Sequence, residues 1–159
     1  MTIENILIPS FKILENIIVI NSMDSTYNKV SNFYNKNPFP DYSKLDNKFD
    51  IKLKGDDNIL SSNFKKLCGY NKQILEAGSG TCQLSNYLAI GTNNKITAMD
   101  SSINALRLGS NFATKNKIKN MNFVNADIHD KIFKKETFDM IFCNGVLHHT
   151  KDPKEGFNI

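Results

Sequence analysis

Short apolar segments alternate with helical patterns from residue 73 onward, and this alternation limits the possible folds more than any other feature. Four segments have the length and composition of buried strands, at residues 73–77, 95–100, 121–125 and 138–144. Apolar residues at helical spacing lie between them, as in the segment 81–90. Strand, helix and strand in this order form right-handed βαβ units, whose strands lie parallel. The sequence therefore predicts an α/β fold with a doubly wound parallel sheet.

The first 55 residues lack this alternation. A helix is expected around residues 26–35, followed by the segment 37–42, which reads Asn-Pro-Phe-Pro-Asp-Tyr. Two prolines so close together exclude a helix and hold the backbone extended. Residues 43–55 are polar and are expected to form a loop. We therefore predict a partly helical N-terminal extension or lid segment over residues 1–55 and a cofactor-binding domain over residues 56–159.

Composition and charge narrow the class of protein. The net charge is +4, and the 20 basic residues are scattered, so nothing clearly indicates nucleic-acid binding. The apolar run at residues 17–20 is too short to cross a bilayer and is expected to be a buried strand or a helix edge. Three cysteines and three histidines show no metal-ligand spacing, and an odd cysteine count suits reduced thiols. We expect a cytoplasmic protein without a metal or a membrane segment, and the oligomeric state stays open.

Residues at the ends of the predicted strands mark the expected binding site, because ligands of parallel α/β sheets bind beyond the carboxyl ends of the strands. Glu76 lies near the end of the first strand, and Gly78-Ser79-Gly80 leads from it into a helix. Glycines let the backbone turn sharply and let a ligand approach closely, and the helix N-terminus adds unpaired N–H groups. Taken alone, the same loop is equally consistent with a tight structural turn.

Asp100 ends the second strand, about 20 residues after the glycines. A carboxylate at this place accepts hydrogen bonds from the two hydroxyls of a ribose. The alternative is that Asp100 only caps the following helix, but Ser101 or Ser102 can serve as that cap. The sequence therefore favours a nucleoside cofactor.

Two kinds of nucleoside cofactor suit such a loop. The dinucleotide fingerprint G-x-G-x-x-G requires glycine at position 83, where this chain has Gln83. Glu76 lies beside the loop and would repel a pyrophosphate, whereas it would attract an ammonium group. S-adenosylmethionine carries an ammonium group, a sulfonium and an adenosine but no phosphate. Electrostatics therefore favour S-adenosylmethionine over NAD.

The loop resembles motif I of class I S-adenosylmethionine-dependent methyltransferases, E/D-x-G-x-G-x-G. It reads Glu76-Ala77-Gly78-Ser79-Gly80-Thr81-Cys82, with Cys82 in place of the last glycine. Residues 96–101 resemble the strand-two motif whose acid holds the ribose, and residues 125–128 resemble the motif whose aspartate meets the adenine amino group. The resemblance implies S-adenosylmethionine as cofactor, bound by Glu76, Gly78, Ser79, Gly80, Asp100, Ser101, Asp127, Ile128 and Asn144.

Residues 138–149 resemble the strand-four motif of the small-molecule methyltransferases often labelled type 11 or type 12, and Asp152-Pro153 resembles the helix start that follows it. The resemblance covers residues 73–153 and implies a Rossmann-like sheet with the strand order 3-2-1-4. The family fold has seven strands, and strands five to seven have no counterpart in this sequence. We therefore expect a fragment or an incomplete product in which strand four, although apolar on both faces, is an open edge prone to self-association.

The resemblance does not identify catalytic residues, since methyl transfer from a sulfonium needs mainly a correctly positioned acceptor. His148 and His149 follow strand four and are weak candidates for a general base, with packing or hydrogen bonding as the alternative. His129 is expected to be an exposed polar residue.

Three aromatic residues of the N-terminal extension, Tyr34, Phe39 and Tyr42, are candidates for a lid over the cofactor. The alternative is that Phe39 fastens this segment to the sheet.

The sequence thus predicts methyl transfer from S-adenosylmethionine to a small-molecule acceptor that it does not identify. Two alternatives stay open. One is an inactive or fragmentary module that binds the cofactor without catalysis. The other is an NAD-binding oxidoreductase, which Gln83 and Glu76 disfavour.

Overall fold

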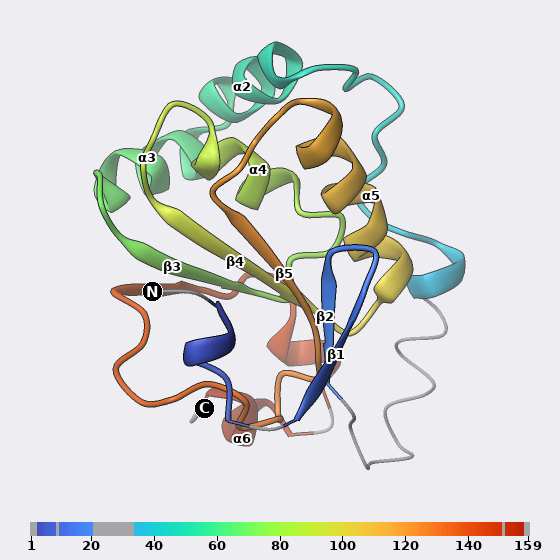
Figure 1. Cartoon of the computed structure of the whole chain (residues 1–159). Helices are drawn as coiled ribbons and strands as arrows, with labels where there is room; N and C mark the ends of the chain where they lie inside the picture. Colours follow the sequence, from blue (N-terminus) through green and yellow to red (C-terminus); the bar gives the residue numbers. More distant parts are fainter. Residues whose placement is uncertain (1–2, 9, 21–33, 151, 158–159) are drawn as a thin grey trace.

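The computed structural model describes residues 3–8, 10–20, 34–150 and 152–157. A six-stranded sheet with the order β1-β2-β5-β4-β3-β6 forms its centre (Figure 1). The strands are β1 (Phe11–Leu14), β2 (Ile17–Ile20), β3 (Gln73–Ala77), β4 (Lys95–Asp100), β5 (Met121–Asn125) and β6 (Met140–Phe142). Neighbouring strands are parallel except β1 and β2, which form an antiparallel hairpin.

Strands β3 to β6 are the four predicted strands, and they lie in the predicted spatial order 3-2-1-4. The α/β fold class and the bounds of the first three strands are confirmed. The fourth strand is shorter than the predicted segment 138–144, because β6 pairs with β3 over three residues only. The expected open edge agrees with the structure: β6 is the last strand of the sheet, and the Ile141 side chain is 57% exposed there.

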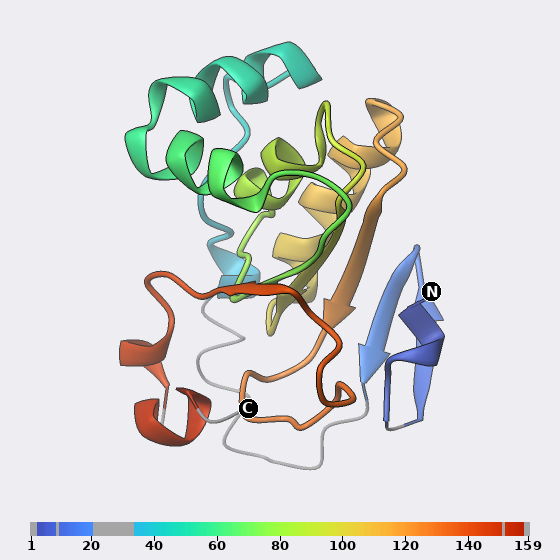
Figure 2. The ribbon, with the colours of Figure 1, turned by 90° about the vertical axis from the view of Figure 1, so that its left-hand side faces the viewer.

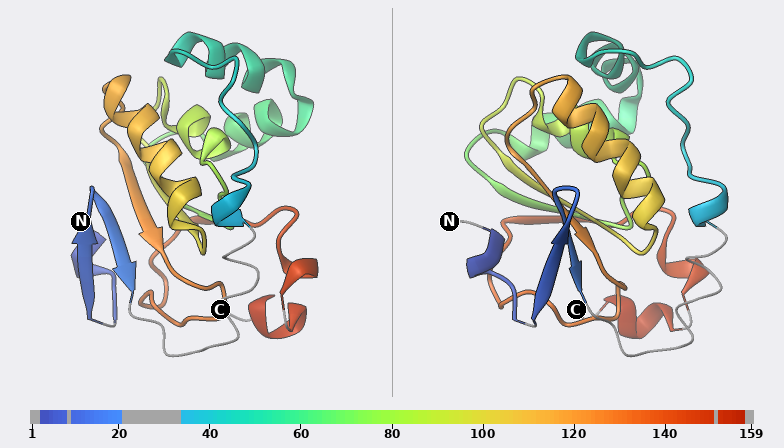
Figure 3. Two further views of the ribbon diagram at one scale, coloured as in Figure 1. Left: turned by 90° about the vertical axis from the view of Figure 1, so that its right-hand side faces the viewer. Right: turned by 45° about the vertical axis from the view of Figure 1, so that its right-hand side comes forward.

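Helices cover one face of the sheet, as Figures 1 and 3 show from different sides. They are α2 (Lys48–Asp57), α3 (Ile59–Cys68), α4 (Gln83–Ala89) and α5 (Ile103–Lys115). Apolar side chains between the helices and the sheet are fully buried, among them Ile96 of β4 and Leu106 of α5. The opposite face packs against Leu7, near the N-terminus, and Ile132, in the loop after β5.

Helix α2 replaces the loop that was expected over residues 43–55. Asn47 caps it, because its side-chain oxygen accepts hydrogen bonds from the first turn while the Asp50 carboxylate accepts one from the Asn47 N–H. The sequence shows little apolar periodicity here, since the helix buries only Ile51 and Gly55. The predicted boundary between residues 55 and 56 falls inside α2, so the backbone is continuously helical across it.

The N-terminal residues join the same sheet. Strand β2 pairs with β5, so the apolar run at residues 17–20 is a buried strand, which is one of the two predicted alternatives. Most of the helix expected at residues 26–35 lies outside the described residues, whereas residues 34–36 are helical. Within the described ranges, no helix combines the length and the apolar character needed to cross a membrane.

Candidate cofactor site at the strand ends

The loops that follow β3, β4 and β5 meet at one edge of the sheet, beyond the carboxyl ends of the strands. The Gly78 N–H donates a hydrogen bond to the Met99 carbonyl (2.8 Å), and the Ala126 N–H donates to the Asp100 carbonyl (3.2 Å). The segment after β6 reaches the same place, because Val146 packs against Gly78. The fold therefore brings the predicted strand ends together.

Every backbone N–H group of residues 78–82 has a partner inside the protein. Gly78 and Ser79 donate to the Met99 carbonyl, Gly80 donates to the Asp100 carboxylate, Thr81 donates to the Phe39 carbonyl, and Cys82 donates to the Ser79 carbonyl. A pyrophosphate site needs such N–H groups to point at the phosphate. The loop therefore offers no backbone donors of the kind on which a dinucleotide site depends.

The two loop glycines are required by close contacts within the protein. Gly78 and Gly80 have φ angles of 78° and 51°, a region that favours glycine. A Cβ atom at Gly78 would lie 2.2 Å from the Val146 side chain, and one at Gly80 would lie 2.4 Å from the Phe39 carbonyl oxygen. That these glycines also admit a ligand stays a prediction.

The Asp100 carboxylate lies between two of these loops. Its Oδ2 atom accepts a hydrogen bond from the Gly80 N–H (2.7 Å), and its Oδ1 atom accepts one from the Ser102 N–H (2.8 Å). The Ser101 backbone also hydrogen-bonds this carboxylate, and since a carboxylate has about four lone-pair positions, about one is left for a further donor such as a ribose hydroxyl. Burial raises the pKa of Asp100, against the effect of these backbone hydrogen bonds. Ser102 caps α5, as one of the two predicted caps.

Glu76 is buried within β3, with 7% of its surface exposed. Its carboxylate accepts a hydrogen bond from the Ser85 hydroxyl of α4. Burial raises the pKa of Glu76 to about 7, although the Ser85 hydrogen bond acts in the opposite direction. A positive charge close to this carboxyl would favour its ionised form.

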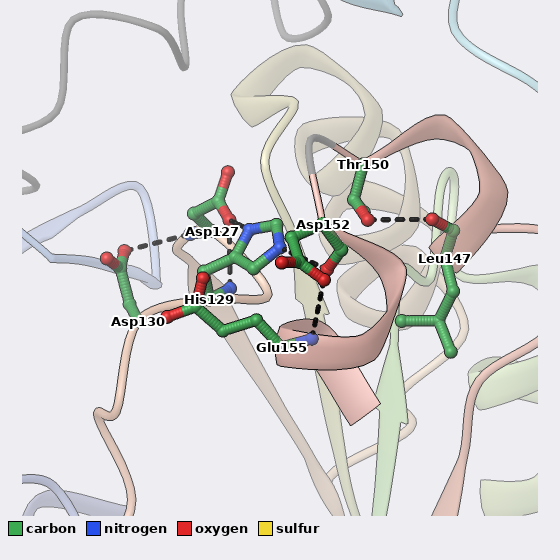
Figure 4. A network of polar contacts seen from close by, with 7 residues as sticks. All are labelled: Asp127, His129, Asp130, Leu147, Thr150, Asp152 and Glu155. Carbon is green, nitrogen blue, oxygen red and sulfur yellow. Dashed lines mark hydrogen bonds and ion pairs between the residues drawn. The ribbon is translucent and has the colours of Figure 1, made fainter. Parts of the chain in front are cut away.

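Asp127 follows β5 and forms a network with His129 and Asp152 (Figure 4). Its Oδ1 atom accepts a hydrogen bond from the His129 backbone N–H (2.9 Å) and lies 2.7 Å from His129 Nδ1. His129 Nε2 lies 3.0 Å from the Asp152 carbonyl oxygen. The expectation of an exposed His129 is wrong: its side chain is 23% exposed, because the turn after β5 folds the ring back onto Asp127.

The other predicted residues lie around this centre. The Ser101 carbonyl accepts a hydrogen bond from the Asn125 side chain (2.9 Å), Ile128 is partly buried against the sheet, and Asn144 is exposed. His148 and His149 are exposed in the short helix η3 (Leu147–His149), which lies near α6 (Pro153–Phe157) (Figure 2). Their ring centroids are 3.9 Å apart, and no carboxylate of the described residues forms an ion pair with either ring.

Residues 35–42, called the strap below, lie against the loops after β3 and β4. Thr81 binds the strap twice: its N–H donates to the Phe39 carbonyl (3.3 Å), and its hydroxyl donates to the Pro40 carbonyl (2.5 Å). At the other end, the Asn35 side-chain oxygen accepts a hydrogen bond from the Ser102 hydroxyl (2.9 Å). The strap therefore connects two loops of the candidate site.

Tyr42, and not Phe39, fastens the strap with its side chain. The Tyr42 hydroxyl donates to the Thr81 carbonyl (2.8 Å), and its ring packs on Phe112 of α5 with centroids 5.1 Å apart. Phe39 holds the strap through its backbone carbonyl, while its side chain is 73% exposed. The suggestion that the Phe39 side chain fastens this segment is thus wrong, whereas a lid role stays a prediction.

Gln83 holds the same strap. Its side-chain amide donates to the carbonyls of Pro40 (3.3 Å) and Asp41 (2.6 Å), and its oxygen accepts a hydrogen bond from Lys54 (2.7 Å). Gln83, which departs from the dinucleotide fingerprint, therefore holds the strap through side-chain hydrogen bonds that glycine cannot form. Sequence reasoning missed this task, because no local pattern links positions so far apart.

The fold and the site together define a class of protein. A parallel α/β sheet carries carboxylates at the ends of successive strands, and the N–H groups of its first strand-end loop are already used. Such a site suits a nucleoside that carries a positive charge and free hydroxyls, and it does not suit a pyrophosphate.

Comparison with known families agrees with this class. A family model described as a methyltransferase domain matches residues 69–159. The chain belongs to this methyltransferase domain family, and the resemblance to class I S-adenosylmethionine-dependent methyltransferases is confirmed.

Individual relatives match only part of this chain. An uncharacterised protein of Synechococcus sp. is 34% identical over 86 residues, which make up 53% of this chain and 21% of that protein. This chain therefore spans about a fifth of the length of that relative.

Solved structures share the fold at low identity. A SAM-dependent methyltransferase from Aquifex aeolicus superposes with a TM-score of 0.56 at 20% identity, over 72% of this chain and 65% of that one. Phosphoethanolamine N-methyltransferase 1 of Haemonchus contortus gives 0.55 at 18%, over 74% and 24%. The [4+2]-cyclase SpnF gives 0.58 at 17%, over 61% and 37%. These similarities show the fold alone.

Proposed function

We propose that this chain binds S-adenosylmethionine at the strand-end site and forms part of an enzyme that transfers the methyl group to a small molecule. The observation that carries the proposal is the chemistry of the site: Glu76, Asp100 and Asp127 supply carboxylates, while the loop N–H groups are engaged within the protein. Asp100 would accept a hydrogen bond from a ribose hydroxyl, Asp127 one from the adenine amino group, and Glu76 would balance the ammonium charge.

The bound cofactor supplies a methyl group on a positively charged sulfur atom, which is already activated for transfer. The protein then contributes mainly by orienting the two reactants. Here the strap and Gln83 hold the loop of residues 78–82, and Ser102 holds one side of Asp100. A general base is needed only for an acceptor that loses a proton, and His148 and His149 are candidates for it.

A cofactor-binding module without methyl transfer is the second candidate. It is favoured by the exposed histidines, neither of which has a carboxylate ion-pair partner within the described residues that would orient it as a base. An NAD site is disfavoured further by the structure, because Gln83 and the N–H groups of residues 78–82 are occupied.

Calorimetric titration with S-adenosylhomocysteine tests the proposal, with NAD as the competing ligand. We expect binding of S-adenosylhomocysteine alone, weakened about tenfold or more in D100A, since a carboxylate that accepts several hydrogen bonds is lost. The matched control is D139A, because Asp139 also accepts a backbone N–H, from Gln73 at the opposite end of β3 (2.7 Å). Binding of NAD, or no binding of S-adenosylhomocysteine to a folded chain, would contradict the proposal.

Transfer of labelled methyl groups separates the two candidates. The wild-type chain is incubated with labelled S-adenosylmethionine and a small-molecule extract, with D100A as the negative control. Label in a small-molecule product supports the enzyme, whereas binding without any labelled product supports the module.

A further inference from the structure

Both ring nitrogens of His129 face hydrogen-bond acceptors (Figure 4). Nδ1 lies 2.7 Å from the Asp127 Oδ1 atom, and Nε2 lies 3.0 Å from the Asp152 carbonyl oxygen. A backbone carbonyl can only accept, and an ionised carboxylate can only accept. A neutral imidazole carries one N–H group and would leave one of these contacts without a proton, so the geometry favours the imidazolium form.

The two partners of His129 belong to different parts of the chain. Asp127 lies in the turn after β5, where its own N–H donates to the Asp130 carboxylate (3.0 Å). Asp152 precedes α6, and its carboxylate accepts hydrogen bonds from the N–H groups of Lys154 and Glu155 (both 2.9 Å). His129 therefore joins the candidate adenine-binding turn to the start of α6.

The charged groups that act on the ring are acidic. Asp127 faces it from its own turn, and Asp152, just before α6, and Glu155 of α6 lie on the other side. A hollow of about 360 Å³ beside them is lined by Lys131, Asp152, Lys154 and Glu155. Burial of the ring works against its charge, but the hydrogen bonds to Asp152 and Asp127 outweigh burial and raise the pKa of His129 above its ordinary 6.5.

We propose that His129 is a positioning residue, held as an imidazolium, which fixes the Asp127 carboxylate for adenine and clamps the turn after β5 to α6. Oδ1 of Asp127 is engaged by His129, and no hydrogen bond from the described residues reaches Oδ2. Oδ2 is therefore the oxygen left for an adenine amino group. This last step rests on the proposed cofactor function, whereas the clamp itself does not.

The clamp depends on pH in a defined direction. A histidine whose pKa is raised by folding contributes stability that is fully present below pH 6.5 and is lost as the pH rises through the folded pKa. Adenosine is the suitable probe, because it lacks the ammonium group that would respond to Glu76. The affinity of the chain for adenosine should fall as His129 loses its proton. If binding raises the pKa of His129 by half a unit, the affinity falls about threefold on deprotonation.

The first experiment is an NMR titration of the three histidine rings in the full chain between pH 5 and 9, with H129Q, H148Q and H149Q used to assign the resonances. We expect His129 to titrate above pH 6.5 with both nitrogens protonated below its pKa, and D127N to lower that pKa. A His129 ring that is neutral at pH 6.5, or that D127N does not affect, overturns the proposal.

The second experiment follows adenosine binding by amide chemical shifts over the same pH range. The wild-type affinity should fall at high pH, while H129Q, whose amide donates at any pH, should give a flat profile. A wild-type profile that is flat or rises overturns the positioning role. If adenosine binds at no pH while the His129 titration is as expected, the cofactor assignment fails and the clamp stands.

Discussion

Cys82 occupies the position of the third glycine in the family motif, and its side chain meets Gly109 of α5. Cys82 is fully buried and has a φ of 61°, which is unusual for a residue with a side chain. A Cβ atom at Gly109 would lie 2.6 Å from the Cys82 Cβ and 2.8 Å from the Thr81 carbonyl oxygen. The Cys82 side chain, which stands where the family motif has glycine, is thus accommodated by the glycine at position 109 of the facing helix.

The substitution G109A tests this contact. Alanine favours a helix over glycine, yet we expect G109A to lower the free energy of unfolding by about 1–3 kcal/mol, because the added methyl group overpacks the contact. The additional change C82G should recover part of the loss. Urea unfolding measures both, and N111A at an exposed position of α5 is the control, expected to be neutral or slightly stabilising. A stable G109A would contradict the packing argument.

Glu76 gives the cofactor site a pH dependence with a defined sign. Its pKa of about 7 is raised by burial, so the ligand-free chain loses stability as the pH rises through 7 and the buried carboxyl ionises. A bound ammonium group favours the ionised form, and the affinity for S-adenosylhomocysteine should therefore increase between pH 6 and 8. Calorimetry at several pH values measures this, and E76Q should remove the increase. If the affinity of E76Q for S-adenosylhomocysteine increased equally steeply, a group other than Glu76 would cause the pH dependence.

At the scale of elements, the strap and the loop of residues 78–82 behave as one unit. The substitution Y42F removes the hydroxyl that donates to the Thr81 carbonyl and accepts a hydrogen bond from Asn86 (3.3 Å). We expect a loss of about 1–2 kcal/mol in stability, since buried polar groups lose a partner. The affinity for S-adenosylhomocysteine should fall as well, because the loop is less ordered.

Thermal unfolding and calorimetry measure these two effects. Y70F is the matched control, since Tyr70 is 67% exposed, and it should change neither quantity. Lower stability with unchanged affinity in Y42F would show that the strap supports the fold without ordering the cofactor loop.

At the scale of the whole molecule, β6 is an edge strand within the described residues, pairing with β3 alone. Its residues Met140–Phe142 carry no charge, and Ile141 is exposed. The opposite edge strand, β1, is also exposed at Ile13, but Lys12 lies beside it, and an edge lysine discourages pairing with another chain.

We therefore expect self-association through β6, measured by sedimentation velocity at increasing protein concentration. The substitution I141K should shift the distribution toward the monomer, because a charge at the edge opposes strand pairing. I13K, at the other edge, is the control and should have little effect. A wild-type chain that stays monomeric at high concentration would contradict the expectation.

The sequence by itself determined the α/β class and the strand ends where the acidic residues lie, whereas the order of the four parallel strands came from the resemblance to the methyltransferase family. These features follow from short-range patterns: apolar runs set β3, β4 and β5, and a serine at position 102 caps α5. Helix α2 escaped the prediction because it buries too few residues to show an apolar period.

Only the tertiary structure decided how the site is held. The strap contact between Gln83 and Asp41 spans 42 positions, and the contact between His129 and Asp152 spans 23. The fit of Cys82 against Gly109 likewise joins a loop to a helix across the core. Such pairs form because packing brings distant segments together, and neither partner carries a local pattern that identifies the other.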